Sequence, residues 1–202
     1  MKLYYSPAAC SLSPHIALRE SGVSFELEQV DLKTKKTKSG ADFLKVNPKG
    51  YVPVLQLDDG QPLTEAAVIV QYIADKKPEA KLLPPGGTSD RYRAQEWLNY
   101  VATELHKGIG ALFNPNLTDP WKQVLRQGLA PKFDFLTKRL EGKSFAFGDG
   151  FSVIDGYLFT VLGWPQHVGL DLAKWPVLTS YSEKIAQRPA VQAALKAEGL
   201  VK

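Results

Sequence analysis

The chain has 202 residues, of which 44% are hydrophobic and 23% charged, and its formal net charge at pH 7 is +4. A chain of this length buries roughly 70% of its extended surface on folding, which supplies a core without disulfides or metals. No apolar stretch approaches the ~18 residues of a membrane span, and the apolar run at residues 1–5 is too short for a secretory signal. We therefore expect a cytoplasmic globular protein with one large domain or two small ones, and no membrane partner.

The distribution of charge and the cysteine count exclude further classes. The densest basic run, Lys33 to Lys38, has no interleaved aromatic residue, so it is typical of a solvated loop and not of a nucleic-acid surface. A modest positive charge suits small anionic ligands. Cys10 is the only cysteine, and a lone cysteine provides neither an internal disulfide nor a structural zinc or iron–sulfur site. We expect no metal and no nucleic-acid partner.

The first third of the chain alternates short apolar runs with helical patterns. Residues 2–5 form an apolar run that predicts a strand, and residues 25–30 alternate with period two, which predicts another. Between them, residues 12–21 have a helical pattern that Gly22 would close. These elements predict a βαβ unit.

A hairpin and a second helix follow in the sequence. Strands are predicted at 54–57 and 61–63, on either side of the turn Asp58-Asp59-Gly60. The helical pattern at 64–74 has Thr64 as a candidate cap. Added to the βαβ unit, this layout predicts the small α/β sandwich of thioredoxin-like domains.

The composition changes after residue 76, where prolines and glycines interrupt every periodicity and mark a linker. Strand-like alternation then disappears. Helices are predicted at about 89–108, 120–140, 152–162, 175–186 and 191–198. We therefore expect an α/β thioredoxin-like domain at 1–78, a linker at 79–88 and an all-α domain at 89–202.

Cys10 stands directly before the first predicted helix. The unpaired N–H groups and the dipole at a helix N-terminus favour the thiolate, so we expect the pKa of this thiol to be lowered. Such a cysteine is often reactive. The competing interpretation is a small buried apolar residue, which is the more common state of a lone intracellular cysteine.

Two other segments add candidate binding groups. Pro53 stands at the entry of a strand, where its bond to Val52 can be cis and would leave the backbone of Val52 free to pair with an extended peptide. Glu65 and Ala66 open the next helix, where N–H groups suit a carboxylate and the acidic side chain suits an ammonium group. Each feature also has an ordinary structural explanation.

The first helix after the linker carries a polar stripe. Asn99, Thr103 and His106 are spaced by four and three residues, which predicts that they share one helix face. A lone histidine is often only a surface residue, but this alignment favours a wall that faces a site.

Four segments together resemble the bacterial beta-class glutathione transferases, and the resemblance covers essentially the whole chain. They are "YSPAACSLSPHIALRESG", "VNPKGYVPVLQLDDGQPLTEAAVIVQYIAD", "EWLNYVATELHKG" and "FSVIDGYLF". The resemblance implies a homodimeric detoxifying enzyme with a thioredoxin-like domain and an all-helical domain. It also implies glutathione as co-substrate and no other cofactor.

The resemblance implies roles on the sulfur side of glutathione. Cys10 would lie beside the sulfur, bonding to it or forming a mixed disulfide, and His106 would be the second group there. Val52 would pair its backbone with the cysteinyl moiety ahead of a cis Pro53. Lys35 would approach the glycyl carboxylate.

At the other end, the resemblance implies that Glu65 and Ala66 hold the γ-glutamyl moiety. Many relatives have serine at the place of Ala66, so a hydroxyl contact is absent here and weaker binding is expected. Asn99, Thr103 and Glu104 would line the remaining side, some of them across a dimer interface.

The electrophile is expected between the domains, against apolar walls. The candidates for these walls are aromatic residues and one proline: Tyr5, Phe113, Pro115, Tyr157 and Trp164. Bound glutathione must react as its thiolate. The leading hypothesis is therefore conjugation of glutathione to small hydrophobic electrophiles.

Two alternatives remain open on the same fold. Thiol–disulfide exchange through Cys10 would make the protein a glutaredoxin-like thiol transferase, although Ser13 occupies the position of a second cysteine. The other alternative is a non-catalytic protein that binds glutathione or another ligand. Ser152 and Asp155 form a candidate capping box, to which we assign a role in folding worth on the order of 1 kcal/mol.

Overall fold

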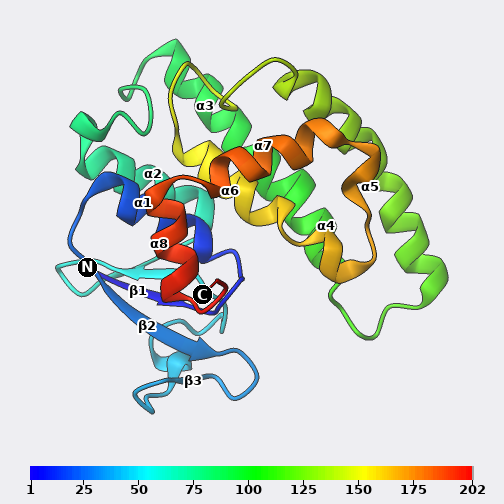
Figure 1. Ribbon diagram of the computed structural model, residues 1–202. Helices are drawn as coiled ribbons and strands as arrows, with labels where there is room; N and C mark the ends of the chain where they lie inside the picture. Colours follow the sequence, from blue (N-terminus) through cyan, green and yellow to red (C-terminus); the bar gives the residue numbers. More distant parts are fainter. Residues whose placement is uncertain (202) are drawn as a thin grey trace.

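The computed structural model describes residues 1–201, as an α/β unit followed by helices (Figure 1). The last residue of the predicted all-α domain, Lys202, lies outside the described residues. The sheet has the strand order β3-β2-β1-β4-β5. Its strands are β1 (Lys2–Tyr5), β2 (Glu26–Asp31), β3 (Lys36–Thr37), β4 (Val54–Gln56) and β5 (Pro62–Thr64).

The pairing of the strands confirms the predicted βαβ unit and hairpin. β1 and β2 are parallel, with Leu3 opposite Leu27, whereas β1 and β4 are antiparallel, with Leu3 opposite Leu55. β4 and β5 form the antiparallel hairpin. The short strand β3 lies within the lysine-rich run that was predicted to be only a solvated loop.

Two helices accompany the sheet, α1 (Leu12–Ser21) and α2 (Ala66–Lys76). α1 ends at Gly22 in the left-handed conformation, as the sequence predicts. The prediction for α2 is wrong at its start, because Thr64 still pairs with Val54 in the sheet and Glu65 occupies the N-cap position.

The rest of the chain is helical. Its α-helices are α3 (Ser89–Tyr100), α4 (Lys107–Ala111), α5 (Asp119–Leu140), α6 (Val153–Leu162), α7 (Pro176–Ala186) and α8 (Pro189–Ala197). Short 3-10 turns occur at 78–80, 165–168 and 172–174, and another, at 43–45, lies within the α/β unit between β3 and β4. The predicted single helix at 89–108 is instead α3 and α4 joined by a π-helical segment, Val101–His106. No helix within residues 1–201 is both long and apolar enough to cross a membrane.

The α/β unit and the helices share one continuous apolar core. α1 packs against both α6 and α8 (Figure 1), and Glu198, directly after α8, contacts the loop between β1 and α1. Gly156 of α6 allows the close approach to α1, because a Cβ there would lie 3.3 Å from Ile16 Cγ2. Glu20 of α1 also accepts two hydrogen bonds from Arg188, at 2.6 and 2.9 Å.

The predicted capping box is present at the start of α6. Asp155 is buried and accepts hydrogen bonds from Ser152 N and Oγ, both at 2.8 Å. Its other oxygen accepts from Ala146 N at 2.7 Å and from the Tyr181 hydroxyl at 2.6 Å. The carboxylate therefore ties the loop before α6 and helix α7 to the start of α6.

Candidate active site

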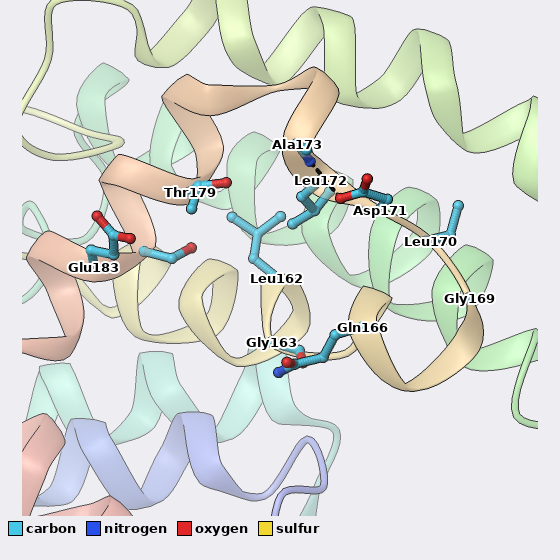
Figure 2. Close-up of a pocket in the computed structure, with 11 residues that line it drawn as sticks. Leu162, Gly163, Gln166, Gly169, Leu170, Asp171, Leu172, Ala173, Thr179 and Glu183 are labelled. Atoms are coloured by element: carbon cyan, nitrogen blue, oxygen red, sulfur yellow. Dashed lines mark hydrogen bonds between the residues drawn. The ribbon is translucent and has the colours of Figure 1, made fainter.

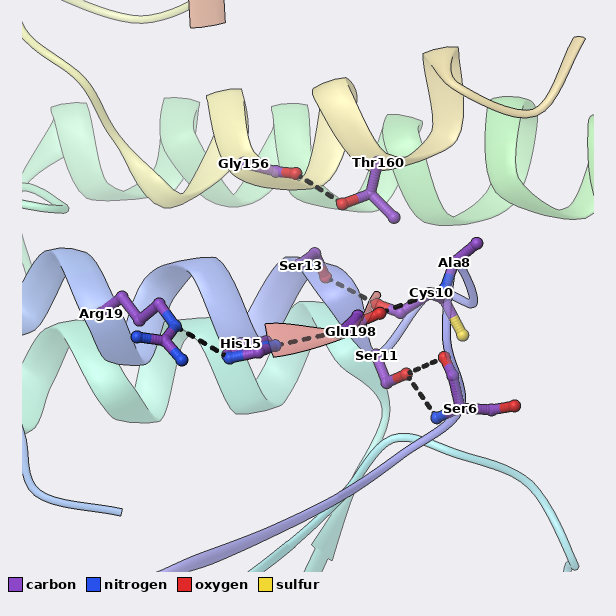
Figure 3. Close-up of polar contacts among 10 residues, drawn as sticks. All are labelled: Ser6, Ala8, Cys10, Ser11, Ser13, His15, Arg19, Gly156, Thr160 and Glu198. Atoms are coloured by element: carbon purple, nitrogen blue, oxygen red, sulfur yellow. Dashed lines mark hydrogen bonds and ion pairs between the residues drawn. The ribbon is translucent and has the colours of Figure 1, made fainter. Parts of the chain in front are cut away.

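Cys10 lies in the loop between β1 and α1, and both ends of this loop are fixed by hydrogen bonds (Figure 3). Ser11 Oγ accepts from Ser6 N at 3.1 Å and donates to Ser6 O at 3.2 Å. Ala8 has a φ of 60°, which is rare for a residue with a side chain. Its N–H donates to the Glu198 carboxylate at 3.1 Å, and its carbonyl oxygen accepts from Trp164 Nε1 at 2.9 Å. Residues far along the chain thus set the position of the cysteine loop.

Glu198 has a second partner in α1, which extends this network (Figure 3). Its other carboxylate oxygen lies 2.9 Å from Nδ1 of the fully buried His15. Arg19 donates from Nε to His15 Nε2 at 2.9 Å. The buried carboxylate therefore links the cysteine loop, α1 and the end of α8.

The expectation of a lowered pKa for Cys10 is wrong. Burial raises the pKa of this thiol to about 11, and the backbone N–H of Cys10 and the charge of Lys107 only partly oppose the effect. Cys10 lies before the N-cap Ser11 and not within the first helical turn, so the helix terminus acts on it less than expected. The protonated thiol donates to the backbone oxygen of Val52 at 3.3 Å.

The segment that precedes β4 approaches Cys10. The Val52–Pro53 peptide bond is cis, as the sequence allows. The side chain of Lys35 reaches this segment from another part of the chain. Its ammonium donates to the Gly50 carbonyl at 2.9 Å and lies 5.7 Å from the ring centre of Tyr51.

The N-terminus of α2 forms a polar end of the site. Glu65 occupies the N-cap position with a φ of 71°, a left-handed backbone conformation that residues with side chains adopt at an energetic cost. Lys49 donates to its carboxylate at 2.8 Å and to Thr64 Oγ1 at 2.9 Å. The hydrogen bond from Lys49 lowers the pKa of Glu65, so this carboxylate is ionised at neutral pH. The first N–H groups of α2, beginning at Ala66, have no partner within the helix.

His106 ends the π-helical segment and is held by aromatic residues of the last third of the chain. Its Nδ1 lies 2.6 Å from the hydroxyl of Tyr157 in α6. Its ring packs edge to face on Trp164, with a centroid distance of 5.0 Å. Burial, followed by the nearby charge of Lys107, lowers the pKa of His106 to about 4. The imidazole is therefore neutral at physiological pH.

These groups border one pocket of about 470 Å³. Of the residues predicted from the sequence, the pocket is lined by Cys10, Val52, Glu65, Ala66, Asn99, His106 and Tyr157. The sequence reasoning did not identify other lining residues, namely Asn47, Lys49, Tyr51, Thr64, Ala67, Val68, Ala102 and Lys107. Two of these residues could have been found from the sequence, because Lys49 lies close to the Val52–Pro53 segment and Lys107 directly follows His106.

The predicted polar stripe is divided by the π-helical segment. Asn99 and His106 line the pocket, but Thr103 does not, because its hydroxyl is turned back to the Asn99 carbonyl at 3.0 Å. A π turn is wider than an α turn and shifts the residues that follow it around the axis. Glu104 is also outside the lining and pairs with Lys132 at 2.8 Å.

Of the candidate electrophile residues, only Tyr157 lines the pocket; Tyr5, Phe113, Pro115 and Trp164 do not. Trp164 packs on His106 and also on Phe113, whose ring centre is 6.2 Å away and whose side chain is half exposed. Pro115 is exposed in the loop after α4. Tyr5 is buried near His15, with a ring centroid distance of 6.1 Å, and does not line the pocket.

A separate cavity of about 750 Å³ lies among the helices, between the end of α6 and α7 (Figure 2). Leucines form its apolar part, and Thr179 and Glu183 contribute polar groups. None of the predicted site residues lines this cavity. The pocket at Cys10 is therefore the candidate active site.

Comparisons with known proteins match both parts of the chain. The model of the glutathione S-transferase N-terminal domain matches residues 8–76, and that of the C-terminal domain matches residues 119–197. Glutathione S-transferase GstA of Escherichia coli O157:H7 is 47% identical over 99% of this chain and 100% of its own length.

Two solved structures agree over their full lengths. A sphingomonad glutathione S-transferase in complex with glutathione is 50% identical, with a TM-score of 0.95 and 100% of both chains covered. The beta-class enzyme of Sphingomonas chungbukensis is 51% identical, with a TM-score of 0.96 and the same coverage. The chain therefore belongs to the glutathione S-transferase family, whose members use glutathione as co-substrate, and within it to the bacterial beta class.

Proposed function

We propose that the pocket at Cys10 binds glutathione and presents its thiolate to small hydrophobic electrophiles. The observation that carries the proposal is that one pocket brings together a thiol, a neutral imidazole, a strand-entry backbone and a helix N-terminus. The tripeptide needs these partners, because it has a sulfur, a peptide backbone and charged ends. The sphingomonad relative in complex with glutathione, at 50% identity, supports the same ligand here.

The chemistry of each group suggests the orientation of the tripeptide. The γ-glutamyl end has an ammonium group that suits the Glu65 carboxylate, and a carboxylate that suits the N–H groups at the start of α2. The cysteinyl moiety would pair with the backbone of Val52. The sulfur would then lie between Cys10 and His106, and the glycyl carboxylate would lie toward Lys35.

Activation of the glutathione thiol requires only modest stabilisation of its thiolate. A decrease of one pKa unit corresponds to ~1.4 kcal/mol, which one or two hydrogen bonds to the sulfur supply. Both Cys10 and His106 carry a proton at neutral pH, because the pKa of the thiol is raised and the imidazole is neutral. The Cys10 S–H, which here donates to the Val52 carbonyl oxygen, would turn to the glutathione sulfur when the tripeptide pairs with the Val52 backbone. We assign hydrogen-bond donation to the glutathione sulfur to both residues.

The walls for the electrophile are proposed beside the sulfur. Trp164, which is buried, packs on His106, and the half-exposed Phe113 packs on Trp164, so the three rings form an aromatic cluster next to the pocket that Tyr157 itself borders. The exposed Pro115 remains a candidate, whereas the buried Tyr5, which does not line the pocket, is no longer one.

Titration calorimetry with glutathione tests this proposal. Glu65→Gln should weaken binding by about tenfold, because the charged partner of the ammonium group is lost. Glu79→Gln is the matched control, since Glu79 also pairs with a lysine, at 3.1 Å from Lys77, but lies outside the pocket. Absence of binding to the unmodified protein at millimolar glutathione, or equal affinities of the two variants, would refute the assignment.

Thiol–disulfide exchange is a second candidate activity, because Cys10 lines the pocket proposed for glutathione. Attack of the Cys10 thiolate on a mixed disulfide between glutathione and a substrate thiol would release the substrate as its thiolate and leave Cys10 joined to glutathione. A second glutathione thiolate would then attack this disulfide, regenerate the Cys10 thiolate and leave as glutathione disulfide. The raised pKa of Cys10 disfavours this attack at neutral pH. Conjugation is therefore the favoured activity. Cys10→Ala separates the two, because it should abolish the exchange while it retains measurable conjugation.

We also propose a homodimer, following the resemblance. Tyr51 and Val68 border the pocket yet are 70% and 46% exposed, which suits burial by a second copy. Thr103 and Glu104, which do not line the pocket of their own chain, would then serve the interface. Light scattering should give twice the monomer mass for the unmodified protein and a smaller mass for Val68→Glu. The cytoplasmic location remains a prediction from the sequence.

A further inference from the structure

His106 is held at one ring nitrogen only. Its Nδ1 lies 2.6 Å from the Tyr157 hydroxyl, and within residues 1–201 this is the only hydrogen bond of its ring, so Nε2 makes none. Because His106 and Cys10 border the same pocket, Nε2 is the nitrogen left to serve a ligand there. The position of the single ring proton thus decides whether His106 offers the pocket a donor or an acceptor.

The contact with Tyr157 has two arrangements. In the first, the phenol donates to Nδ1, and the imidazole proton resides on Nε2. In the second, Nδ1–H donates to the phenolic oxygen, and the phenol proton then needs another acceptor. Among the described residues the Tyr157 hydroxyl has no partner besides His106, although the side chain is only 1% exposed. The second arrangement leaves a buried donor unpaired and is disfavoured.

We propose that Tyr157 is a positioning residue that fixes His106 as the Nε2–H tautomer, so that this imidazole donates a hydrogen bond into the pocket and does not act there as a proton acceptor. The role of that donor at the glutathione sulfur rests on the proposed function. Burial raises the pKa of Tyr157 and lowers that of His106, which keeps the phenol protonated and the imidazole neutral. The charged groups nearest this pair, Lys107 and Glu65, oppose each other in their effect on the imidazole.

His15 provides an internal contrast. Its Nε2 accepts from Arg19 Nε at 2.9 Å, and its Nδ1 faces the carboxylate of Glu198 at 2.9 Å. An acceptor at Nε2 and a carboxylate at Nδ1 require the proton on Nδ1. The two buried or half-buried histidines of this chain therefore carry opposite tautomers.

Nitrogen NMR of histidine-labelled full-length protein, without ligand at neutral pH, measures this directly. For His106 we expect an unprotonated Nδ1 and a protonated Nε2, and for His15 the reverse pattern. His167→Gln removes the remaining, exposed histidine from the spectrum. A proton on Nδ1 of His106 in the unmodified protein would overturn the proposal. This measurement needs neither a Tyr157 variant nor bound glutathione.

Tyr157→Phe then tests the cause. The variant should shift His106 toward a mixture of tautomers and lower kcat for conjugation by about tenfold, with the KM for glutathione changed less than twofold. Tyr181→Phe is the matched control, because it also removes a buried hydroxyl with a 2.6 Å hydrogen bond, here to Asp155. It should reduce stability without moving the His106 pattern.

The outcomes separate the two proposals. An unchanged His106 pattern and kcat in Tyr157→Phe would overturn the positioning role. If the tautomers are as expected but the unmodified protein binds no glutathione in calorimetry, the proposed function fails and the role of Nε2–H at the sulfur fails with it. The tautomer assignment itself would stand in that case.

Discussion

Replacing Glu198 by glutamine should destabilise the protein and loosen the loop that carries Cys10. Both carboxylate oxygens of Glu198 are used, one by Ala8 N–H at 3.1 Å and one by His15 Nδ1 at 2.9 Å, and the side chain is completely buried. A glutamine amide presents one oxygen and one NH₂ group, so one of the two N–H donors must face another donor. His15 cannot relieve the conflict by moving its proton, because its Nε2 already accepts from Arg19.

The magnitude follows from the bond that is lost. A hydrogen bond to a charged acceptor contributes ~1.5–3 kcal/mol, and an unpaired buried donor adds to this loss. We therefore expect Glu198→Gln to lower the free energy of unfolding by about 2–4 kcal/mol. For a chain of this size that corresponds to a decrease in Tm of roughly 5–12 °C.

Thermal unfolding followed by circular dichroism measures the effect, with the exposed Glu183→Gln as control. The control should stay within ~0.5 kcal/mol of the unmodified protein. Hydrogen exchange of the backbone at residues 8–11 should also accelerate in Glu198→Gln, because Ala8 loses its anchor. Equal Tm values for the two variants would show that the buried carboxylate is not needed, and the reasoning from its partners would be wrong.

Three further predictions concern the thiol, the capping carboxylate and the aromatic support of His106. Since the pKa of Cys10 is raised to about 11, iodoacetamide should alkylate this thiol at neutral pH more than ~100-fold more slowly than an ordinary thiol. The alkylation rate should continue to rise with pH well beyond pH 9, and a plateau near pH 8 would contradict this. In urea denaturation, Asp155→Ala should lower the free energy of unfolding by ~3–5 kcal/mol, because Ala146 and Tyr181 also lose their buried acceptor. A loss near the ~1 kcal/mol expected from a capping box alone would show that these two hydrogen bonds contribute little. Trp164→Phe should raise the KM for an aromatic electrophile more than the KM for glutathione, since the smaller ring reduces the aromatic cluster beside His106 and the hydrogen bond to Ala8 is lost. Steady-state kinetics with both substrates varied tests this prediction. An effect confined to the KM for glutathione would exclude the proposed wall.

The fold was predictable from the sequence because local signals agree with one another. Gly22 ends α1 where the apolar periodicity stops, and the Asp58-Asp59-Gly60 turn joins the two strands of the hairpin. The errors lie where tertiary structure overrides local pattern. Thr64 has the chemistry of a helix cap but is held in the sheet by Val54, and the short strand β3 exists only because Val30 and Asp31 pair with it.

The candidate site was predictable in its parts but not in its electrostatics. The lowered pKa expected for Cys10 considered the helix terminus alone, whereas the sulfur is buried in a pocket whose other lining residues, such as Val52, His106 and Tyr157, are distant in sequence. The helix face expected for Asn99, Thr103 and His106 assumed a regular α-helix. Nothing in the residue pattern indicated the π-helical turn that separates Thr103 from the pocket.

The anchoring of the cysteine loop has a consequence for the order of events during synthesis. The partners of Ala8 follow it by 156 residues, in Trp164, and by 190 residues, in Glu198. A ribosome therefore exports the whole sheet and most of the helices before these contacts can form, and contacts so distant in sequence close late and slowly. The loop that bears the only thiol is made long before its partners and is among the last segments to be completed, so a nascent chain, or one that ends before Glu198, would carry an unfinished site.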